Sequence, residues 1–361
     1  MEAVIPKIEL HSHISGCYRQ TSINKVLAEE RAQLLAGPEE LIQSIKSDPK
    51  NPLRYLLEPD WEWKPLEKQI TYSEKTWDDC MKAFVLTSIA SRNTSNVLQM
   101  FSEVIEDYAN DGTIYAEFRI GLKGRDKNER AKFCETLIQI IKAAESKYQI
   151  IVKLLVSVAR HATWQGSFEH ALEDVEIAEM FPEYVVGVEL GGNPYSGSWK
   201  NIQKIFDIAR SKNLKVALHL GENSDKQEEW NEMIDWKPDR IGHATFVNSD
   251  GLAKIQEYKI PLELCITVAS DWFCVENDKL VFCKLPGHPV IFCCDNTSLF
   301  ATTFENEYTL AREYLGLNNE ALAKLSYQAI DYAFCATETK NELKQRFEES
   351  LRSQGISQLL H

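Results

Sequence analysis

The sequence predicts an α/β protein, a (β/α)8 TIM barrel with a long helical insertion after its first strand and helices at its C-terminal end. Three observations predict this fold. Eight short runs rich in β-branched and aliphatic residues recur along the chain, and most are separated by stretches with helical periodicity. Side chains that bind metals or transfer protons stand at the ends of several runs. Active sites of such barrels lie at the carboxyl ends of the strands, so this third observation supports the other two.

The predicted strands are near-continuous apolar runs, which are typical of a parallel sheet covered by helices. In chain order they are Ile8–Ile14, Thr113–Ile120, Ile150–Ala159, Val185–Gly192, Lys215–Gly221, Arg240–Phe246, Pro261–Thr267 and Pro289–Asp295. Between them, Phe168–Met180 and Trp199–Lys212 repeat apolar residues every three or four positions, which predicts amphipathic helices that cover the sheet.

The connection between the first two predicted strands, residues 17–111, is far longer than the others. A connection of that length has structure of its own and is usually functional. It holds helical patterns and an aromatic section, Trp61–Pro65, so we expect a helical insertion that acts as a lid over the barrel mouth. Glu305–Ser353 reads as helices packed outside the barrel. No repeat, low-complexity tract or linker is visible, so we expect residues 1–361 to form a single domain.

The composition excludes some classes of function. The 361 residues are 44% hydrophobic and 26% charged, which allows a sizeable core. A formal net charge of −14 argues against a nucleic-acid polymer as partner, because phosphate backbones need a basic surface. The chain has no signal-peptide pattern at its start and no apolar run of membrane-spanning length. Nine cysteines without regular spacing fit reduced thiols. We therefore expect a cytoplasmic monomer without a membrane partner.

Metal-binding side chains end three of the predicted strands. His11 and His13 are two residues apart, so both can face the barrel interior if that segment is extended. His219 ends the fifth strand and Asp295 ends the eighth. Taken singly, a histidine in an apolar strand is more often a packed core residue, and an acid after a strand can simply cap a helix. Together, at barrel spacing, these residues predict one convergent metal site.

Three imidazoles, one carboxylate and an open position for water fit catalytic zinc best. Zinc lowers the pKa of bound water to ~7, which makes hydroxide available at neutral pH. We expect Asp295 also to accept a proton or hydrogen bond from that water. His243 would orient the water or stabilise its charge, although it could instead be a packed strand-end residue. Glu222 would not bind metal but would pass a proton to the substrate.

Four segments carry a family resemblance: Pro6–His13, His219–Glu222, Arg240–His243 and Cys294–Asp295. In order and spacing they resemble the signature segments of the adenosine deaminase family, whose members are zinc-dependent (β/α)8 barrels that hydrolyse the 6-amino group of adenine-type purines. The resemblance implies zinc at the residues named above, Glu222 facing purine N1 and His243 beside the attacking water.

The end of the fourth strand adds to this resemblance. Gly187–Pro194 resembles the family segment in which a glycine N–H contacts purine N3, and that glycine would be Gly192. A backbone can approach a flat ring closely only where no side chain intervenes. We also expect His13 to contact substrate. Leu299–Thr302, with Glu305–Tyr308 and the Gly192–Pro194 turn, is similar to the adenosine deaminase-like branch, which includes N6-methyl-AMP deaminases.

The chain departs from the family pattern at two substrate-binding positions. Asn296 stands where relatives have an aspartate that must be protonated to donate to purine N7, whereas an amide donates without a proton. Asn296 could therefore keep the contact, change the base specificity or weaken the enzyme. Ser15 stands where nucleoside deaminases have an aspartate that meets the ribose 5′-hydroxyl. A serine can donate to a 5′-phosphate, which favours a monophosphate, unless Ser15 is only a turn residue.

A phosphate would also need a cation, and three candidates stand near strand ends. They are Arg19, Arg160 and His161, each of which could instead be a surface charge or part of a structural ion pair. Two further departures affect the local shape of the pocket. Leu264–Ser270 lacks the Ser-Asn of relatives, and Ala244 replaces a glycine after His243.

We therefore expect zinc-dependent hydrolytic deamination at C6 of a 6-aminopurine or N6-methylaminopurine nucleotide or nucleoside, giving an inosine-type product. Two alternatives stay open. One is a purine-binding protein with impaired catalysis, as Asn296 would allow. The other is a different metal-dependent barrel hydrolase with altered base specificity, although the end of the fourth strand, at Gly192, offers no bridging lysine. The sequence does not distinguish nucleoside from monophosphate, or an amino from a methylamino leaving group.

Overall fold

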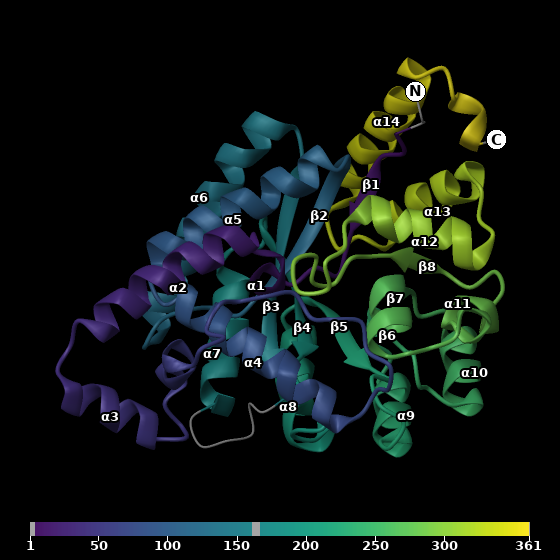
Figure 1. Cartoon of the computed structure of the whole chain (residues 1–361). Helices are drawn as coiled ribbons and strands as arrows, with labels where there is room; N and C mark the ends of the chain where they lie inside the picture. Colours follow the sequence, from purple (N-terminus) through teal and green to yellow (C-terminus); the bar gives the residue numbers. More distant parts are fainter. Residues whose placement is uncertain (1–3, 161–166, 361) are drawn as a thin grey trace.

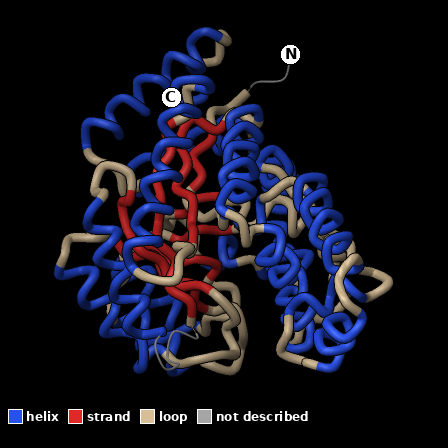
Figure 2. The backbone as a smooth tube through the Cα atoms, turned by 90° about the vertical axis from the view of Figure 1, so that its left-hand side faces the viewer, coloured by secondary structure: helices blue, strands red, loops and turns tan. Residues whose placement is uncertain are grey.

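The computed structural model describes residues 4–160 and 167–360 of the chain. Eight strands form one parallel sheet in chain order and curl into a nearly closed barrel with helices outside (Figures 1 and 2), which confirms the predicted fold class. The strands are β1 (Lys7–Glu9), β2 (Thr113–Ile120), β3 (Ile151–Ala159), β4 (Val185–Gly191), β5 (Lys215–Leu220), β6 (Arg240–His243), β7 (Leu262–Leu264) and β8 (Val290–Phe292).

The barrel is closed at one place by polar contacts rather than by a strand ladder. Each strand pairs with the next along the chain, but within the described ranges no ladder joins β8 to β1. Instead, the backbone N–H of His13 donates to the carbonyl of Asp295 at 2.9 Å. The backbone N–H of Cys294 donates to the carboxylate of Glu9, also at 2.9 Å. These contacts hold the end of β1 and the residues after it against the residues that follow β8.

Several strands end earlier than the sequence predicts. The predicted strands Ile8–Ile14, Arg240–Phe246, Pro261–Thr267 and Pro289–Asp295 are each longer than the observed β1, β6, β7 and β8. For β6 and β8 the cause lies in the backbone, because His243 and Asp295 have φ angles of 64° and 63°. Those angles lie in the left-handed region, which an extended strand does not visit. The apolar runs therefore continue past the point where the chain leaves the sheet.

Helices that follow the strands cover the outside of the barrel. They include α6 (Lys127–Tyr148), α7 (Ser167–Met180), α8 (Trp199–Ser211), α9 (Gln227–Asp235), α10 (Ser249–Tyr258) and α11 (Val281–Lys284). α8 shows the principle, since Trp199, Ile202, Ile205 and Phe206 form one buried face at helical spacing. After β8, α12 (Phe304–Leu315), α13 (Asn319–Tyr332) and α14 (Thr337–Ser353) follow, and α13 packs on β1 and β8. No helix of the described part of the chain has the length and apolarity needed to cross a membrane.

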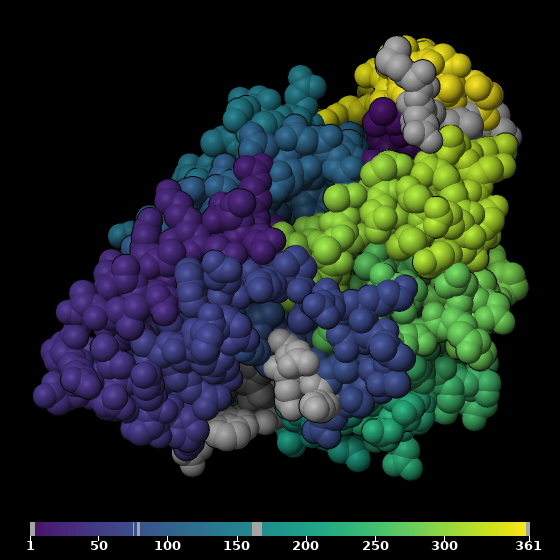
Figure 3. Space-filling model, in the orientation of Figure 1, coloured from purple at the N-terminus to yellow at the C-terminus, as the bar shows by residue number. Residues whose placement is uncertain are grey.

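The long segment between β1 and β2 is helical, as predicted. It contains α1 (Ile14–Cys17), α2 (Gln20–Leu35), α3 (Glu39–Ser47), η1 (Pro52–Leu57), α4 (Glu74–Ala90) and α5 (Thr94–Asn110). In Figure 3 its purple and blue surface spreads across one face and borders the green surface of later barrel elements. Two backbone hydrogen bonds join it to segments that follow barrel strands. The N–H of Leu66 donates to the carbonyl of Leu299 at 2.7 Å, and the N–H of Gln69 donates to the carbonyl of Asp271 at 2.8 Å. That the segment acts as a lid over the barrel mouth stays a prediction.

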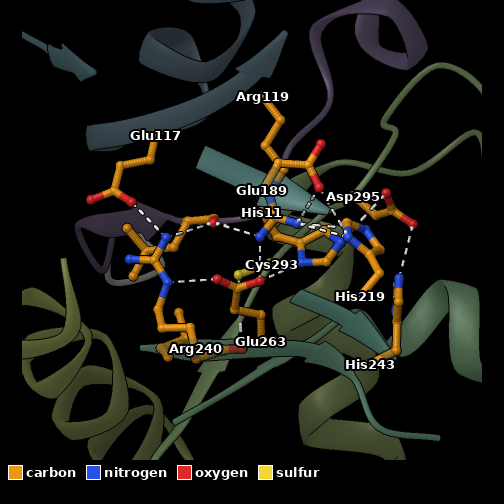
Figure 4. A network of polar contacts seen from close by, with 12 residues as sticks. His11, Glu117, Arg119, Glu189, His219, Arg240, His243, Glu263, Cys293 and Asp295 are labelled. Carbon is orange, nitrogen blue, oxygen red and sulfur yellow. Dashed lines mark hydrogen bonds and ion pairs between the residues drawn. The ribbon is translucent and has the colours of Figure 1, made fainter. Parts of the chain in front are cut away.

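A buried network of charged side chains links three strands below the barrel mouth (Figure 4). Arg240 on β6 donates to Glu117 on β2 and to Glu263 on β7, each at 2.6 Å. Arg119 on β2 also donates to Glu263. All four side chains are fully buried. Buried charges of this kind are tolerated because each has a partner, and removing one partner leaves an uncompensated charge.

We predict that Arg240→Met lowers the apparent free energy of unfolding by about 3–5 kcal/mol, because Glu117 and Glu263 lose a shared buried cation. Urea unfolding followed by circular dichroism measures the change. Arg125→Met is the matched control, since Arg125 pairs with Glu129 on the surface and should barely move the transition midpoint. Equal, small shifts in both variants would contradict the prediction.

Candidate active site

The predicted metal-binding residues converge at the carboxyl ends of the barrel strands. One ligand atom each from His11, His13, His219 and Asp295 lies within 4.8 Å of the others. His13 Nε2 and His219 Nε2 are 3.1 Å apart. Asp295 Oδ1 is 3.7 Å from His11 Nε2 and 3.6 Å from His13 Nε2. Residues distant in the sequence are thus brought to one point, as Figure 4 shows for His11, His219 and Asp295.

The two N-terminal histidines reach this point in a way the sequence did not predict in detail. Both lie beyond the end of β1, so they do not share a regular strand. His13 instead forms an isolated parallel bridge with Arg119 of β2. The bridge keeps the segment extended, and the two imidazole centroids are 5.6 Å apart. Extended backbone still directs residues two apart to one side.

Hydrogen bonds at Nδ1 orient two of the imidazole rings. His11 Nδ1 lies 2.7 Å from Glu263 Oε2, and His219 Nδ1 lies 2.7 Å from the carbonyl oxygen of Leu190. Each acceptor fixes the proton on Nδ1 and leaves the Nε2 lone pair free for a metal. In agreement, His11 Nε2 is buried and has no hydrogen-bond partner among the described residues. A buried acceptor without a partner fits a position that a metal ion fills.

The electrostatics of the four groups also fit a bound cation. Burial lowers the pKa of the His11, His13 and His219 imidazoles well below the usual value, so they are neutral and able to bind metal. Burial, with the nearby Glu222 carboxyl second, raises the pKa of Asp295 well above its usual value. A carboxylate that is so poorly solvated is stabilised when a cation lies beside it.

Glu222 and His243 stand next to this group. His243 Nε2 is 4.0 Å from Glu222 Oε1 and 3.9 Å from Asp295 Oδ2, so it lies between the two carboxyl groups. Burial raises the pKa of Glu222 to about 8, and its Oε2 has no hydrogen-bond partner among the described residues. Glu222 is therefore protonated near neutral pH and has a proton to give.

Gly221 explains why Glu222 can occupy this place. It has a φ of 73°, and a Cβ atom there would lie 2.7 Å from the Val247 side chain and 3.0 Å from the Ala244 backbone. Only glycine adopts that angle readily and fits in that space. The turn after β5 is thereby held tight, and the next residue points into the cavity.

A cavity of about 500 Å³ opens from the metal-binding residues. It is lined by most of the residues that the sequence singled out, namely His13, Ser15, Gly192, His219, Glu222, His243, Asp295 and Asn296. α4 contributes an apolar wall through Trp77, Met81 and Phe84. A mostly apolar cavity with a few convergent polar groups is typical of a small-molecule site. Residues of the barrel mouth and of the insertion therefore line the cavity together.

Two of the predicted substrate contacts have distinctive local geometry. Gly192 follows β4 with a φ of 95° and lines the cavity. The amide nitrogen of Asn296 donates to Asp295 Oδ1, while its Oδ1 has no hydrogen-bond partner in the described residues. A Cβ atom added at Gly16 would overlap Asn296, so the amide occupies space that only a glycine leaves free.

The predicted cations for a phosphate are engaged elsewhere. Arg19 pairs with Glu106 and Asp107 at the surface. Arg160 is buried, pairs with Glu229 and stacks over Trp230 at 5.1 Å. Neither lines the cavity, so both fit the structural ion-pair alternative. His161 lies outside the described residues.

Sequence reasoning missed the residues that α4 and the β2 loop bring to the cavity. Lys123 lines it, together with Ser88 and Ser91 from the end of α4. The available signal was a lysine three residues after the predicted strand Thr113–Ile120, where a barrel places functional groups. The contribution of α4 carried no comparable signal, because its position over the barrel depends on long-range packing.

Comparisons with known proteins agree with the fold and the site. A family model described as adenosine deaminase matches residues 58–350. The chain is 30% identical to an N6-mAMP deaminase of Arabidopsis thaliana over 377 aligned positions, which cover 96% of this chain and 97% of the relative. It is 29% identical to an N6-methyl-AMP deaminase of Bos taurus, with 95% of this chain and 93% of the relative covered.

Solved structures give the same result. A crystal structure of Arabidopsis N6-mAMP deaminase MAPDA matches with a TM-score of 0.78 at 28% identity, covering 96% of this chain and 98% of that one. A crystal structure of Arabidopsis ADAL complexed with IMP matches with a TM-score of 0.77 at 27% identity, covering 97% and 98%. Because the family model matches most of the chain and these relatives align over nearly all of it, the chain belongs to the adenosine deaminase family and is an aminohydrolase.

Proposed function

We propose that this protein catalyses zinc-dependent hydrolytic deamination at C6 of a purine nucleotide or nucleoside. The substrate carries a 6-amino or N6-methylamino group, and the product is of the inosine type. The observation that carries the proposal is the convergence of His11, His13, His219 and Asp295 beside the protonated Glu222 in one cavity. The names of the aligned relatives, N6-methyl-AMP deaminases from plant and cattle, support a purine nucleotide.

Zinc is the metal that best suits this donor set. His11, His13 and His219 would supply nitrogen and Asp295 an oxygen, and borderline-soft zinc favours such a mixture. When bound, zinc supplies Lewis-acid activation of the attacking water.

Different side chains of the protein carry out the separate proton transfers. Glu222 gives its proton to purine N1 as the water oxygen bonds to C6, which removes the ring's aromatic character at that carbon. His243 and Asp295, whose Nε2 and Oδ2 atoms are 3.9 Å apart, together take one proton from the attacking water. That proton passes to the departing ammonia or methylamine, and the hydroxyl left on C6 returns its proton to Glu222 as the C6 carbonyl forms. A buried carboxyl with a pKa near 8 is suited to donate because it holds its proton at neutral pH.

Other groups orient the purine. The backbone N–H of Gly192 would donate to N3, and the amide of Asn296 would donate to N7 without needing a proton. Trp77 and Phe84 of α4 offer apolar surface for the base and sugar. Ser15 also lines the cavity and would face the 5′ side of the substrate.

One observation favours a second candidate, a purine-binding protein with impaired catalysis. One of the two N–H groups of the Asn296 amide donates to Asp295 Oδ1, so a single N–H is free for N7 in this conformation. The bond also occupies the oxygen of Asp295, a proposed metal ligand, that lies nearest the His11 and His13 nitrogens. A protein that holds zinc and nucleotide but releases no amine would select this alternative.

Turnover is tested by following the ultraviolet spectrum of the zinc-loaded protein with adenosine, AMP and N6-methyl-AMP, because deamination changes the purine absorbance. We expect Glu222→Gln to lower kcat by about 10²–10⁴-fold while zinc content stays the same, since the amide N–H is too weakly acidic to transfer its proton. Glu232→Gln, which alters an exposed glutamate on α9, is the matched control and should keep full activity. Glu222→Gln with near-normal kcat would exclude this role.

We predict that the purified protein holds one zinc ion per chain and that His219→Ala loses it, because the site then has two nitrogen donors. Elemental analysis measures the metal, and the melting temperature should rise on adding zinc to the wild type only. His288→Ala is the control, since His288 is buried but bonds the carbonyl of Ile260 away from the site. Stoichiometric zinc in His219→Ala would refute the ligand assignment.

Asn296 gives a prediction about pH. In Asn296→Asp, the side chain can donate to N7 only while protonated, so its contribution is present at low pH and lost as the pH rises through its pKa. We expect kcat/KM of this variant to fall on the alkaline side relative to the wild type. Asn296→Leu should lose the contribution at every pH. Superimposable pH profiles for all three proteins would mean that residue 296 does not donate to the base.

A further inference from the structure

We propose that Glu9 is a positioning residue for the metal site, because its carboxylate spans the seam between β1 and β8, where no ladder within the described ranges closes the barrel. The inference rests on the proposed function in one respect, that the four candidate ligands bind a metal ion. It deepens that function, because it names a residue that sets the spacing of those ligands. Glu9 is not among the residues that line the cavity, so it acts only through them.

Three of the four candidate ligands lie at this seam. His11 and His13 follow β1, and Asp295 follows β8. His219 differs, because it lies on β5 and is paired with Gly242 in the ladder to β6. Strand ladders therefore fix the place of His219, whereas the spacing of the other three ligands depends on what holds the seam.

Glu9 holds both sides of the seam with one side chain. It is the last residue of β1 and is fully buried. Its Oε1 accepts from the backbone N–H of His11 at 2.7 Å, and its Oε2 accepts from the backbone N–H of Cys294 at 2.9 Å. The first N–H belongs to a candidate ligand, and the second belongs to the residue directly before the ligand Asp295. A carboxylate has acceptor sites on both oxygens, so it binds the two N–H groups at once.

Asp295 depends most on this support. Its φ of 63° lies in the left-handed region, which costs free energy for a residue with a Cβ atom. Such an angle persists only where the surroundings hold it. Here the N–H of the preceding Cys294 bonds to Glu9, and the carbonyl of Asp295 itself accepts from the N–H of His13 at 2.9 Å. Both contacts come from the β1 side of the seam.

The resulting spacing suits a tetrahedral ion. Asp295 Oδ1 lies 3.7 Å from His11 Nε2 and 3.6 Å from His13 Nε2, and both distances cross the seam. A zinc ion with bonds of about 2.0–2.2 Å places tetrahedral ligand atoms about 3.3–3.6 Å apart. The seam is therefore close to the width that the metal needs. A change at Glu9 would alter that width without replacing any ligand.

The zinc dissociation constant of Glu9→Gln, measured by competition with a chromophoric chelator, tests the inference. An amide has one acceptor oxygen, so one of the two backbone N–H groups would face an NH2 donor and the seam would shift. We expect zinc to bind about 10- to 100-fold more weakly than in the wild type, the usual effect of losing a residue that supports metal ligands. Equal affinities in the variant and the wild type would overturn the inference.

Glu307→Gln is the matched control. Glu307 is also a fully buried carboxylate that accepts from two backbone N–H groups just after a strand, those of Ile266 at 2.7 Å and Thr267 at 3.1 Å. Neither of these residues is a candidate metal ligand. The control variant should lose comparable stability but keep its zinc affinity within a few-fold of the wild type. An equal loss of zinc affinity in Glu9→Gln and Glu307→Gln would leave Glu9 a general structural role and overturn the inference.

A second variant and a spectrum guard against general misfolding. Glu9→Asp keeps the charge and can still accept from the N–H two residues on, but its side chain is one methylene too short to span the seam. We expect it to lose less zinc affinity than Glu9→Gln. The visible spectrum of the cobalt(II)-loaded proteins at saturating metal should shift in both Glu9 variants and not in Glu307→Gln, because it reports ligand geometry rather than stability. Unchanged spectra in both Glu9 variants would contradict the positioning role.

Turnover separates this inference from the proposed function. Zinc affinity and the cobalt spectrum are measured without substrate, so a wild type that binds zinc but deaminates no purine fails the proposed function alone. Weaker zinc binding by Glu9→Gln would then still support the positioning role. Conversely, a wild type that deaminates N6-methyl-AMP, together with unchanged zinc affinity in Glu9→Gln, overturns the positioning role alone.

Discussion

Glu263 is the residue through which the charge network of the barrel reaches the candidate metal ligands. One of its oxygens accepts from both His11 Nδ1 and Arg119, while the other accepts from Arg240. A buried carboxylate is stable only with partners of this kind, and each partner is fixed by the same requirement. The direction of the His11 ring, and with it the place of a metal ion, therefore depends on charges buried below the barrel mouth.

The burial of charged groups also makes the two ends of the cavity electrostatically different. At one end, buried carboxyl groups with raised pKa values, Glu222 and Asp295, favour a cation and retain protons. At the other end, the poorly solvated Lys123 favours an anion. The polarity of the cavity thus follows from where the fold withholds water.

The sequence predicted the barrel, its strand order and the four segments that meet at the site, because buried parallel strands leave apolar runs and their ends carry the polar chemistry. It did not predict where the strands end. His243 and Asp295 leave the sheet at left-handed angles, which neither hydrophobicity nor propensity encodes for residues of these types. The apolar runs accordingly continue beyond the observed ladders.

The sequence by itself determined which residues meet at the proposed active site, since His11, His13, His219, Glu222, His243 and Asp295 stand at strand ends whose order the barrel preserves. Only the tertiary structure decided which positively charged side chains line the cavity. Arg19 and Arg160 are drawn into ion pairs, whereas Lys123 is left without a carboxylate among the described residues. The reason is physical: pairing and burial depend on how α4 and α5 pack over the barrel, and such long-range contacts leave no local pattern.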